Sequence, residues 1–189
     1  LESLNAGHTS EFDRVVEDAL AGDASDALKL LAMAGILQKL AEFAVLARVR
    51  RRLVAITAEL LGTESKAYAT HLTHLAAAFH RMGKYDEAKL LIERAMRINE
   101  KVLGPEHPAL ATGLNNLAEL LKIQGKYDEA KPLYERAVEI GEKALGPEHP
   151  DLAIRLSNLA ELLKIQGKYD EAKPLYERTI AMGERTLGP

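Results

Sequence analysis

The stretch QGKYDEAKPLYER occurs twice in this chain, at residues 124–136 and again at residues 166–178. A looser copy, MGKYDEAKLLIER, occupies residues 82–94, so the three copies follow one another at an interval of 42 residues. Outward from the copied stretch, segments 103–144 and 145–186 are identical at 32 of 42 positions. A fixed period between about 20 and 50 residues is the sequence signature of a solenoid. The sequence therefore predicts a chain of repeated units.

Each unit is expected to contain two helices, and segment 103–144 carries the clearest signals. Pro108 suits the first turn of a helix, where its missing N–H costs least, and Gly125 suits a helix C-terminus. Asp128 is expected to cap the second helix, and Pro132 is expected to limit how early that helix begins. Two apolar stripes recur at helical spacing: Leu110, Leu114, Leu117, Ala118 and Leu121 in the first helix, and Ala130, Leu133, Tyr134, Ala137 and Ile140 in the second.

Small residues are expected to let neighbouring helices approach closely. Ala118, Ala130 and Ala137 serve this purpose within one unit. Gly141 and its copy Gly183 lie inside the second helix, where glycine costs about 1 kcal/mol relative to alanine. We expect both glycines to mark close backbone contacts. Since one hairpin cannot bury its apolar face alone, the hairpins are expected to stack and share a core.

The 42-residue period divides the chain into expected units. These are an N-terminal capping helix (1–18), a degenerate first repeat (19–60), three full repeats (61–102, 103–144 and 145–186) and the start of a truncated further unit (187–189).

The first repeat departs most from the others. Its first helix carries Leu28, Leu31, Ala32 and Gly35 at positions that are mostly polar in the later repeats, and it is apolar on nearly every side. Such a helix is normally buried. We expect either a partner helix or the N-terminal segment to cover it. In that segment Ser10 would act as the cap, and the residues expected to face inward are Phe12, Val15, Val16 and Leu20.

Composition excludes several classes of protein. The net charge of −3 argues against a dedicated nucleic-acid surface. Cysteine is absent, which excludes disulfides and thiol nucleophiles and fits a reducing compartment, so we expect a cytoplasmic protein. The most apolar stretch, residues 30–49, is interrupted by Lys39, Glu42 and Arg48, so no membrane span is expected.

The repeat resembles a known family. Ala118, Ala130 and Ala137, with Gly125 at the turn and Tyr127 after it, resemble a tetratricopeptide repeat. The 42-residue period, with LGPEHP and NNLAELL or SNLAELL, is similar to the long variant of kinesin light chains and to arrays in bacterial signalling ATPases. The resemblance implies an all-α, right-handed solenoid of stacked antiparallel hairpins.

The resemblance also implies a binding groove lined by the first helix of each repeat. Asn116 and Asn158 match the asparagine that holds a bound peptide's backbone in that family, and His74 replaces it one repeat earlier. The other expected groove residues are Asn115, Glu119, Lys122, Ser157, Glu161, Lys164, Thr73, His80 and Arg81. Thr70, Thr112 and Ile154 stand where some members carry a carboxylate clamp, so we expect no strongly acidic or C-terminal carboxylate ligand.

Other candidate sites have plainer interpretations. His71 and His74 have an i, i+3 spacing that can hold a metal, but groove-facing or solvent-facing histidines fit better, and neither a metal nor another cofactor is expected. Arg48, Arg50, Arg51 and Arg52 are expected to form a solvated face, with an anion site as the alternative. The pairs Glu119–Lys122 and Glu161–Lys164 fit a solvated face and a polar groove equally well.

The sequence therefore favours a non-enzymatic scaffold that binds a peptide or protein segment. Two alternatives are kept. One is a regulatory sensor region of a larger signalling protein, and the other is a module that associates end to end through an uncapped last repeat. No phosphate-binding loop or catalytic constellation is recognisable, so an enzyme is not expected.

Overall fold

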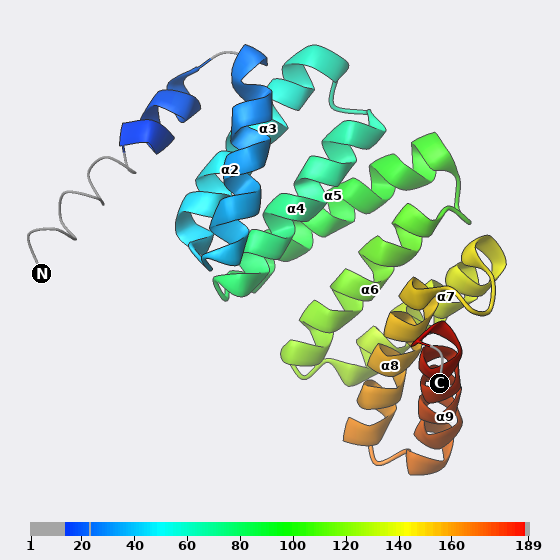
Figure 1. Cartoon of the computed structure of the whole chain (residues 1–189). Helices are drawn as coiled ribbons and strands as arrows, with labels where there is room; N and C mark the ends of the chain where they lie inside the picture. The colour runs from blue at the N-terminus through cyan, green and yellow to red at the C-terminus, as the bar shows by residue number, and fades with distance from the viewer. Residues whose placement is uncertain (1–13, 23, 188–189) are drawn as a thin grey trace, which may run out of the picture. The chain divides into compact units, whose positions relative to one another are not determined.

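The computed structural model describes residues 14–22 and 24–187, and every element in that part of the chain is helical (Figure 1). A 3₁₀ turn, η1 (Ala24–Asp26), precedes eight longer helices. These are α2 (Ala27–Lys39), α3 (Phe43–Leu61), α4 (Lys66–Arg81), α5 (Tyr85–Leu103), α6 (Pro108–Ile123), α7 (Tyr127–Leu145), α8 (Pro150–Ile165) and α9 (Tyr169–Leu187). The predicted all-α class is confirmed.

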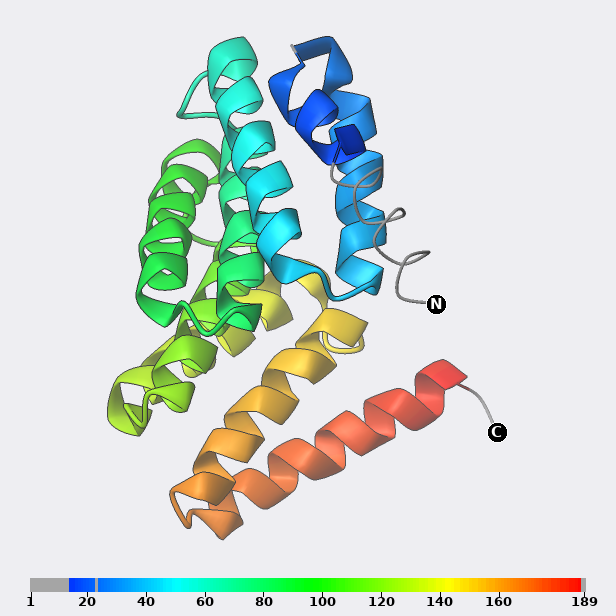
Figure 2. The same ribbon diagram turned by 90° about the vertical axis from the view of Figure 1, so that its left-hand side faces the viewer.

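The ends of α6 follow from local chemistry, as predicted. Pro108 occupies the first turn, and the Nδ1 atom of His107 accepts a hydrogen bond from the Ala109 N–H at 3.1 Å, which caps the helix. After Gln124 the chain reverses at Gly125, whose φ of 74° lies in the left-handed region that glycine tolerates best. The α8–α9 hairpin, whose two helices and tight turn Figure 2 shows, repeats this design with His149 as the cap and Gly167 at the turn.

The start of α7 differs from the prediction. The helix begins at Tyr127 with Lys126 as its N-cap residue, so the expected capping role of Asp128 is wrong. Asp128 lies in the first turn instead, where its negative charge favours the helix N-terminus. Pro132 did not delay the helix either, because it lies inside it and only removes one donor from the backbone ladder.

The chain divides into two compact units, Leu1–Leu91 (unit 1) and Ile92–Pro189 (unit 2), and each is described by itself. In unit 2, Leu110, Leu114 and Ile140 belong to one buried cluster. Leu152, Leu156 and Met182 form a second, and Val138 of α7 packs against it. Unit 2 is therefore held together by the stacking that the repeat predicted.

Gly141 and Gly183 have different surroundings although they are copies. A Cβ atom at Gly141 would lie 3.3 Å from Cδ1 of Leu152 and 3.5 Å from Cδ of Arg155, both on α8, so the expected close approach is confirmed there. At Gly183, among the described residues, no atom outside its own helix lies within 4 Å of that position. The expectation is therefore wrong for Gly183.

In unit 1, residues 14–21 are helical and cover part of the first hairpin. Val16 and Ala19 are buried, and Glu17 pairs with Arg48 at 2.5 Å. Val15 is 51% exposed, so its predicted inward orientation is wrong. Residues 1–13, which include the predicted cap Ser10 and the predicted core residue Phe12, lie outside the described part.

The apolar α2 helix is only partly covered. Leu30, Ala34 and Leu37 are buried, as expected for one face. Leu28 is 78% exposed and Leu31 is 42% exposed, so among the described residues the expected cover over this other face is missing. None of the described helices combines the length and apolarity that crossing a membrane would require.

Candidate functional site

The predicted groove residues of unit 2 occupy one face of α6 and the matching face of α8. Helical spacing brings Asn115, Asn116, Glu119 and Lys122 together on α6. Ser157, Asn158, Glu161 and Lys164 occupy the equivalent places on α8. We call these eight residues the α6–α8 row. Glu161 and Lys164 are exposed and the other six are half-buried, so the row lies where the hairpins meet solvent.

Two hydrogen bonds join the helices along this row. The Nδ2 group of Asn158 donates to Oδ1 of Asn115 at 3.0 Å. One turn earlier, Nη2 of Arg155 lies 3.3 Å from Oγ1 of Thr112 and donates to it. These contacts mean that Asn158, predicted to bind a peptide, already uses one amide donor to hold the two helices together.

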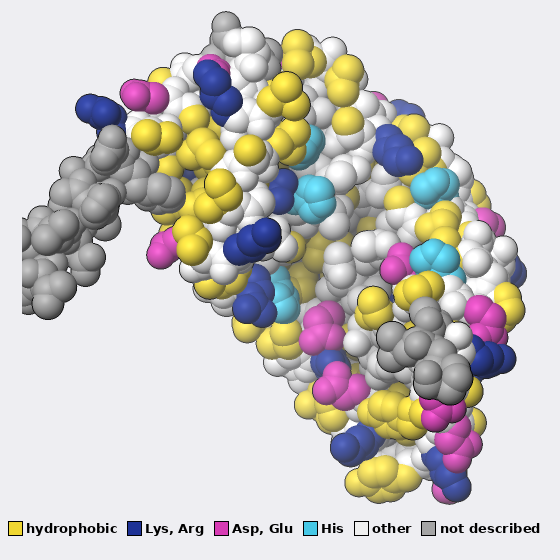
Figure 3. Space-filling model, in the orientation of Figure 1, with side chains coloured by type: hydrophobic (Ala, Val, Ile, Leu, Met, Phe, Trp, Pro, Cys, Tyr) yellow, Lys and Arg dark blue, Asp and Glu magenta, His cyan; other side chains and the backbone are white. Residues whose placement is uncertain are grey.

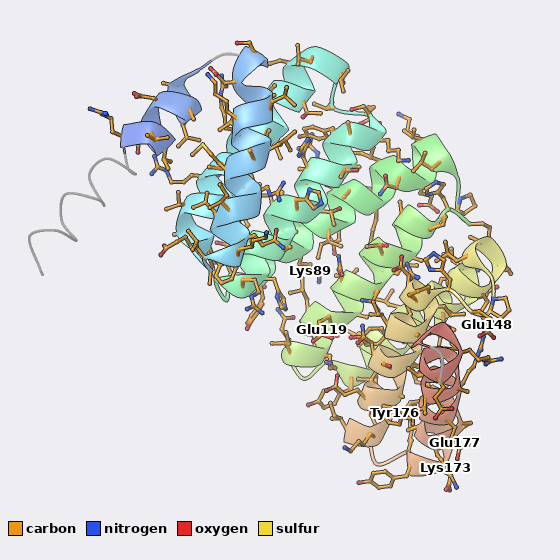
Figure 4. All side chains as sticks on the ribbon, in the orientation of Figure 1. Lys89, Glu119, Glu148, Lys173, Tyr176 and Glu177 are labelled. Carbon is orange, nitrogen blue, oxygen red and sulfur yellow. The ribbon has the colours of Figure 1, made fainter. Side chains whose placement is uncertain are left out.

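A charged network extends the row. Lys122 pairs with Glu119 at 2.9 Å on its own helix and with Glu161 on α8. Glu119 also accepts a hydrogen bond from the hydroxyl group of Tyr134 at 2.7 Å. Figure 4 labels Glu119 on α6. The network ties α6, α7 and α8 together, so both earlier interpretations of Glu119–Lys122 are incomplete: the pair is structural.

The surroundings fix the protonation states of this network. Burial, strengthened by the hydrogen bond to Glu119, holds the pKa of Tyr134 far above its ordinary value. Burial alone would lower the pKa of Lys122, but hydrogen bonds to Glu161 and Glu119 outweigh it and raise that pKa. Tyr134 is therefore neutral and Lys122 charged at physiological pH.

Asn116 differs from its neighbours. Its side chain is half-buried, and it makes no hydrogen bond to any described residue. The side chain of Ser157 likewise makes no hydrogen bond to a described residue. The side chain of Lys164 makes neither a hydrogen bond nor an ion pair with one. An amide carries two donors and an acceptor. Asn116 therefore offers a complete amide at the centre of the row.

The four upstream residues belong to unit 1 and have separate environments. Thr73 donates to the carbonyl of Ala69 in its own helix at 3.1 Å. The ring of His80 meets that of Tyr85 edge to face. The guanidinium of Arg81 lies 5.1 Å from the ring centroid of Phe43. Three of these predicted groove residues thus have structural contacts of their own.

The fourth, His74, lies beside His71 and beside Arg50, whose environment differs from the prediction. Arg50, expected on a solvated face, is only 9% exposed, and its Nη1 atom lies 3.5 Å from Nδ1 of His74. The repeat could have indicated that Arg50 is buried, because a shift of 84 residues aligns Arg50 with Tyr134, which is buried. The described residues contain no group of three or more potential metal ligands.

The sequence of this chain matches a known family of repeats. The sequence model of the tetratricopeptide repeat family matches residues 68–137 and 109–185, which together exceed half of the chain. No curated protein sequence gives a significant match.

Solved structures show the same fold. BtubC (BKLC) from P. vanneervenii superposes with a TM-score of 0.77 at 20% identity, covering 98% of this chain and 77% of the other. A kinesin-light-chain-like protein of Podosopora anserina with nearly identical TPR-like repeats gives 0.71 at 26%, with 98% and 92% covered. Aspartyl phosphate phosphatase F from Bacillus subtilis gives 0.75 at 17%, with 87% and 42% covered. The predicted solenoid of helix hairpins is confirmed.

Proposed function

Because this chain belongs to the tetratricopeptide repeat family, we propose that it is a non-enzymatic scaffold that binds an extended peptide segment of a partner along the α6–α8 row. One observation carries the proposal. Asn116 presents an amide with no hydrogen-bond partner among the described residues, half-buried in a row where Asn115, Asn158 and the network around Lys122 are already held in place.

The physical argument rests on preorganisation. An extended peptide exposes N–H and C=O groups that lose water when they bind, so they need partners that match both kinds of group. The amide of Asn116 supplies a donor and an acceptor. The network around Lys122 is already fixed by Glu119 and Glu161, so the row loses little side-chain freedom on binding.

The network also bears on which peptides are accepted. Glu119 and Glu161 both pair with Lys122 already. A basic side chain of a peptide would therefore gain less from contact with either carboxylate. Lys164 is exposed and, among the described residues, unpaired, so it gives the C-terminal end of the row a free positive charge. We propose that selectivity comes from this end and from Ser157.

A peptide-library selection on immobilised chain, followed by titration of each hit, tests the proposal. Asn116→Ala is the decisive variant, because the side chain makes no hydrogen bond to any described residue that its loss would break. We expect this variant to bind peptides that share the selected motif at least about tenfold more weakly, which equals about 1.4 kcal/mol.

Asn158→Ala needs a matched control, because it also removes the bond to Asn115. Asn115→Ala breaks the same bond while leaving Asn158 in place. We expect Asn158→Ala to weaken binding more than Asn115→Ala does. Equal losses would mean that only the helix contact matters. Hits that bind Asn116→Ala as tightly as the parent would contradict the proposed row.

Self-association is a second proposal, which an observation on α9 favours. In α7, Val138 packs on a cluster that includes Leu152 and Leu156. Its copy in α9, Ile180, is 61% exposed, and Gly183 beside it faces open space among the described residues. We propose that a second copy of this chain covers the face formed by Ile180 and Gly183, with α9 packing against α9.

A further inference from the structure

Three residues of unit 1 depart from the repeat at neighbouring places. At the position of Arg50 the three later repeats carry isoleucine or tyrosine, which are uncharged. At the position of His74 the two last repeats carry asparagine, and at that of His71 they carry glycine and arginine. Since the repeats share the same packing requirements, departures gathered at one place indicate a local role beyond packing.

The geometry brings the three side chains together. Arg50 lies on α3, and His71 and His74 lie one turn apart on α4, against which α3 packs. The Nη1 atom of Arg50 is 3.5 Å from Nδ1 of His74, and the two imidazole rings meet edge to face with their centroids 6.2 Å apart. Figure 3 shows histidine side chains next to a basic side chain over this part of α4.

The contact with Arg50 orients His74. A guanidinium group has donors only, so Nδ1 of His74 must accept and the ring proton lies on Nε2. His74 as a residue is exposed although its ring is partly enclosed, and its Nε2 atom has no hydrogen-bond partner among the described residues, so this N–H group is the donor that it offers to a ligand. His71 is half-buried, and its Nδ1 atom is buried without a partner among the described residues.

Within the described part of the chain, the cluster has no counter-charge. Among the described residues, no carboxylate contacts Arg50, His71 or His74. The neighbouring basic groups on α3 are engaged elsewhere, because Arg48 pairs with Glu17 and Arg51 lies over the ring of Phe79. Arg50 is only 9% exposed as a residue, and a buried arginine without an anion is costly, so such groups often mark a site for an ion.

The protonation of the cluster agrees with a missing anion. Burial lowers the pKa of Arg50, and burial followed by the charge of Arg50 lowers the pKa of both histidines. Arg50 stays charged at physiological pH, because an arginine begins from a value above about 12. The histidines are therefore neutral donors around one fixed positive charge.

We propose that Arg50, His71 and His74 form a binding site for a phosphate group. A carboxylate has two oxygens, which a single guanidinium satisfies, whereas a phosphate presents three or four oxygens to donors from several directions. Donors from two helices suit the phosphate. The positive charge of Arg50 beside the two histidines also disfavours a metal cation there.

Titration with inorganic phosphate tests the site, with the imidazole nitrogens followed by NMR near neutral pH at constant ionic strength. Signals of His71 and His74 should shift in a saturable way, and those of His149, the helix cap of α8, should not. Arg50→Gln should weaken binding at least about tenfold. Arg48→Gln removes the same charge from the same helix and should leave binding unchanged, because Arg48 already has a carboxylate partner.

A fold check and two further ligands complete the test. If Arg50→Gln fails to fold, His74→Asn decides, because asparagine occupies that position in the two last repeats. O-phosphoserine binding more tightly than inorganic phosphate would assign the site to phosphate esters, and the reverse order to free phosphate. Acetate binding as tightly as phosphate, or no saturable shift with phosphate, would overturn the proposal. Peptide binding at Asn116 is measured separately, so the two proposals fail independently.

Discussion

At the scale of single residues, histidine has two different roles in this chain. His107 and His149 stand in the repeated LGPEHP joint, and each accepts a hydrogen bond from the backbone N–H two residues later at 3.1 Å. They therefore act as helix caps, in the place where serine, threonine, asparagine and aspartate are most common. His71 and His74, by contrast, lie beside the positive charge of Arg50.

The first prediction concerns His107, the cap of α6. His107→Ala removes the acceptor of the Ala109 N–H group, so the free energy of unfolding should fall by about 1 kcal/mol. His107→Asn supplies another good capping side chain and should recover most of that loss. Urea denaturation followed by circular dichroism measures both variants. An alanine variant as stable as the parent would mean that the cap contributes nothing.

The second prediction concerns pH. The pKa of His71 and of His74 is lowered in the folded chain, so the unfolded chain binds more protons than the folded chain does at mildly acidic pH. The stability from this difference is complete above about pH 6.5, the ordinary histidine pKa, and is lost as pH falls through the folded pKa values. His74→Asn should reduce the pH dependence of the denaturation midpoint. An unchanged profile would contradict this environment.

The burial and the contacts of single side chains were the features that the sequence predicted least well. Arg50 belongs to a basic run, and nothing in its neighbours distinguishes a buried guanidinium from the exposed ones of Arg48 and Arg51. Only its alignment with Tyr134 in a later repeat reveals the burial. Similarly, the bond from Asn158 to Asn115 depends on how two helices 43 residues apart are placed, which spacing alone does not specify.

At the scale of helices, local signals predicted ends better than beginnings. Pro108 and Gly125 mark a helix start and a helix end correctly, because each has a backbone restriction or freedom that few other residues share. Asp128 and Pro132 gave wrong predictions for the start of α7. The apolar side chains of α7 pack against α6 and α8, and this packing extends the helix further than the local signals favour.

Pro132 gives a prediction at this scale. The ring removes one donor from the backbone ladder of α7, and the side chain is exposed, so nothing compensates by burial. Pro132→Ala should raise the free energy of unfolding by about 1–3 kcal/mol. Pro174→Ala tests the copied position in α9 and should act in the same direction. A loss of stability in both variants would show that proline contributes something beyond the helix geometry.

At the scale of the whole molecule, the repeat in the sequence predicted most of the fold. The 42-residue period and two apolar stripes predicted stacked hairpins, and the clusters around Leu114 and Leu156 confirm them in unit 2. The repeat boundaries and the groove assignment remain predictions. Near-identical repeats carry the same signals everywhere, so a period by itself cannot show which copy binds a partner.

Self-association is the prediction that belongs to this scale. Burying Ile180 between two copies would contribute about 1.5–3 kcal/mol per side chain, so light scattering at millimolar concentration should detect species larger than the monomer. Ile180→Lys should abolish them. Lys173→Gln, on the same helix and labelled in Figure 4, should not. A strictly monomeric parent at that concentration would remove this proposal.

The central claim is that the α6–α8 row receives a peptide through Asn116. The most direct measurement follows the side-chain amide signal of Asn116 by NMR while a selected peptide is added. A large, saturable shift is predicted there, together with slower exchange of the amide protons with water, because the peptide backbone would replace water as their hydrogen-bond partner. An unchanged Asn116 signal, with shifts confined to other parts of the chain, would contradict the account.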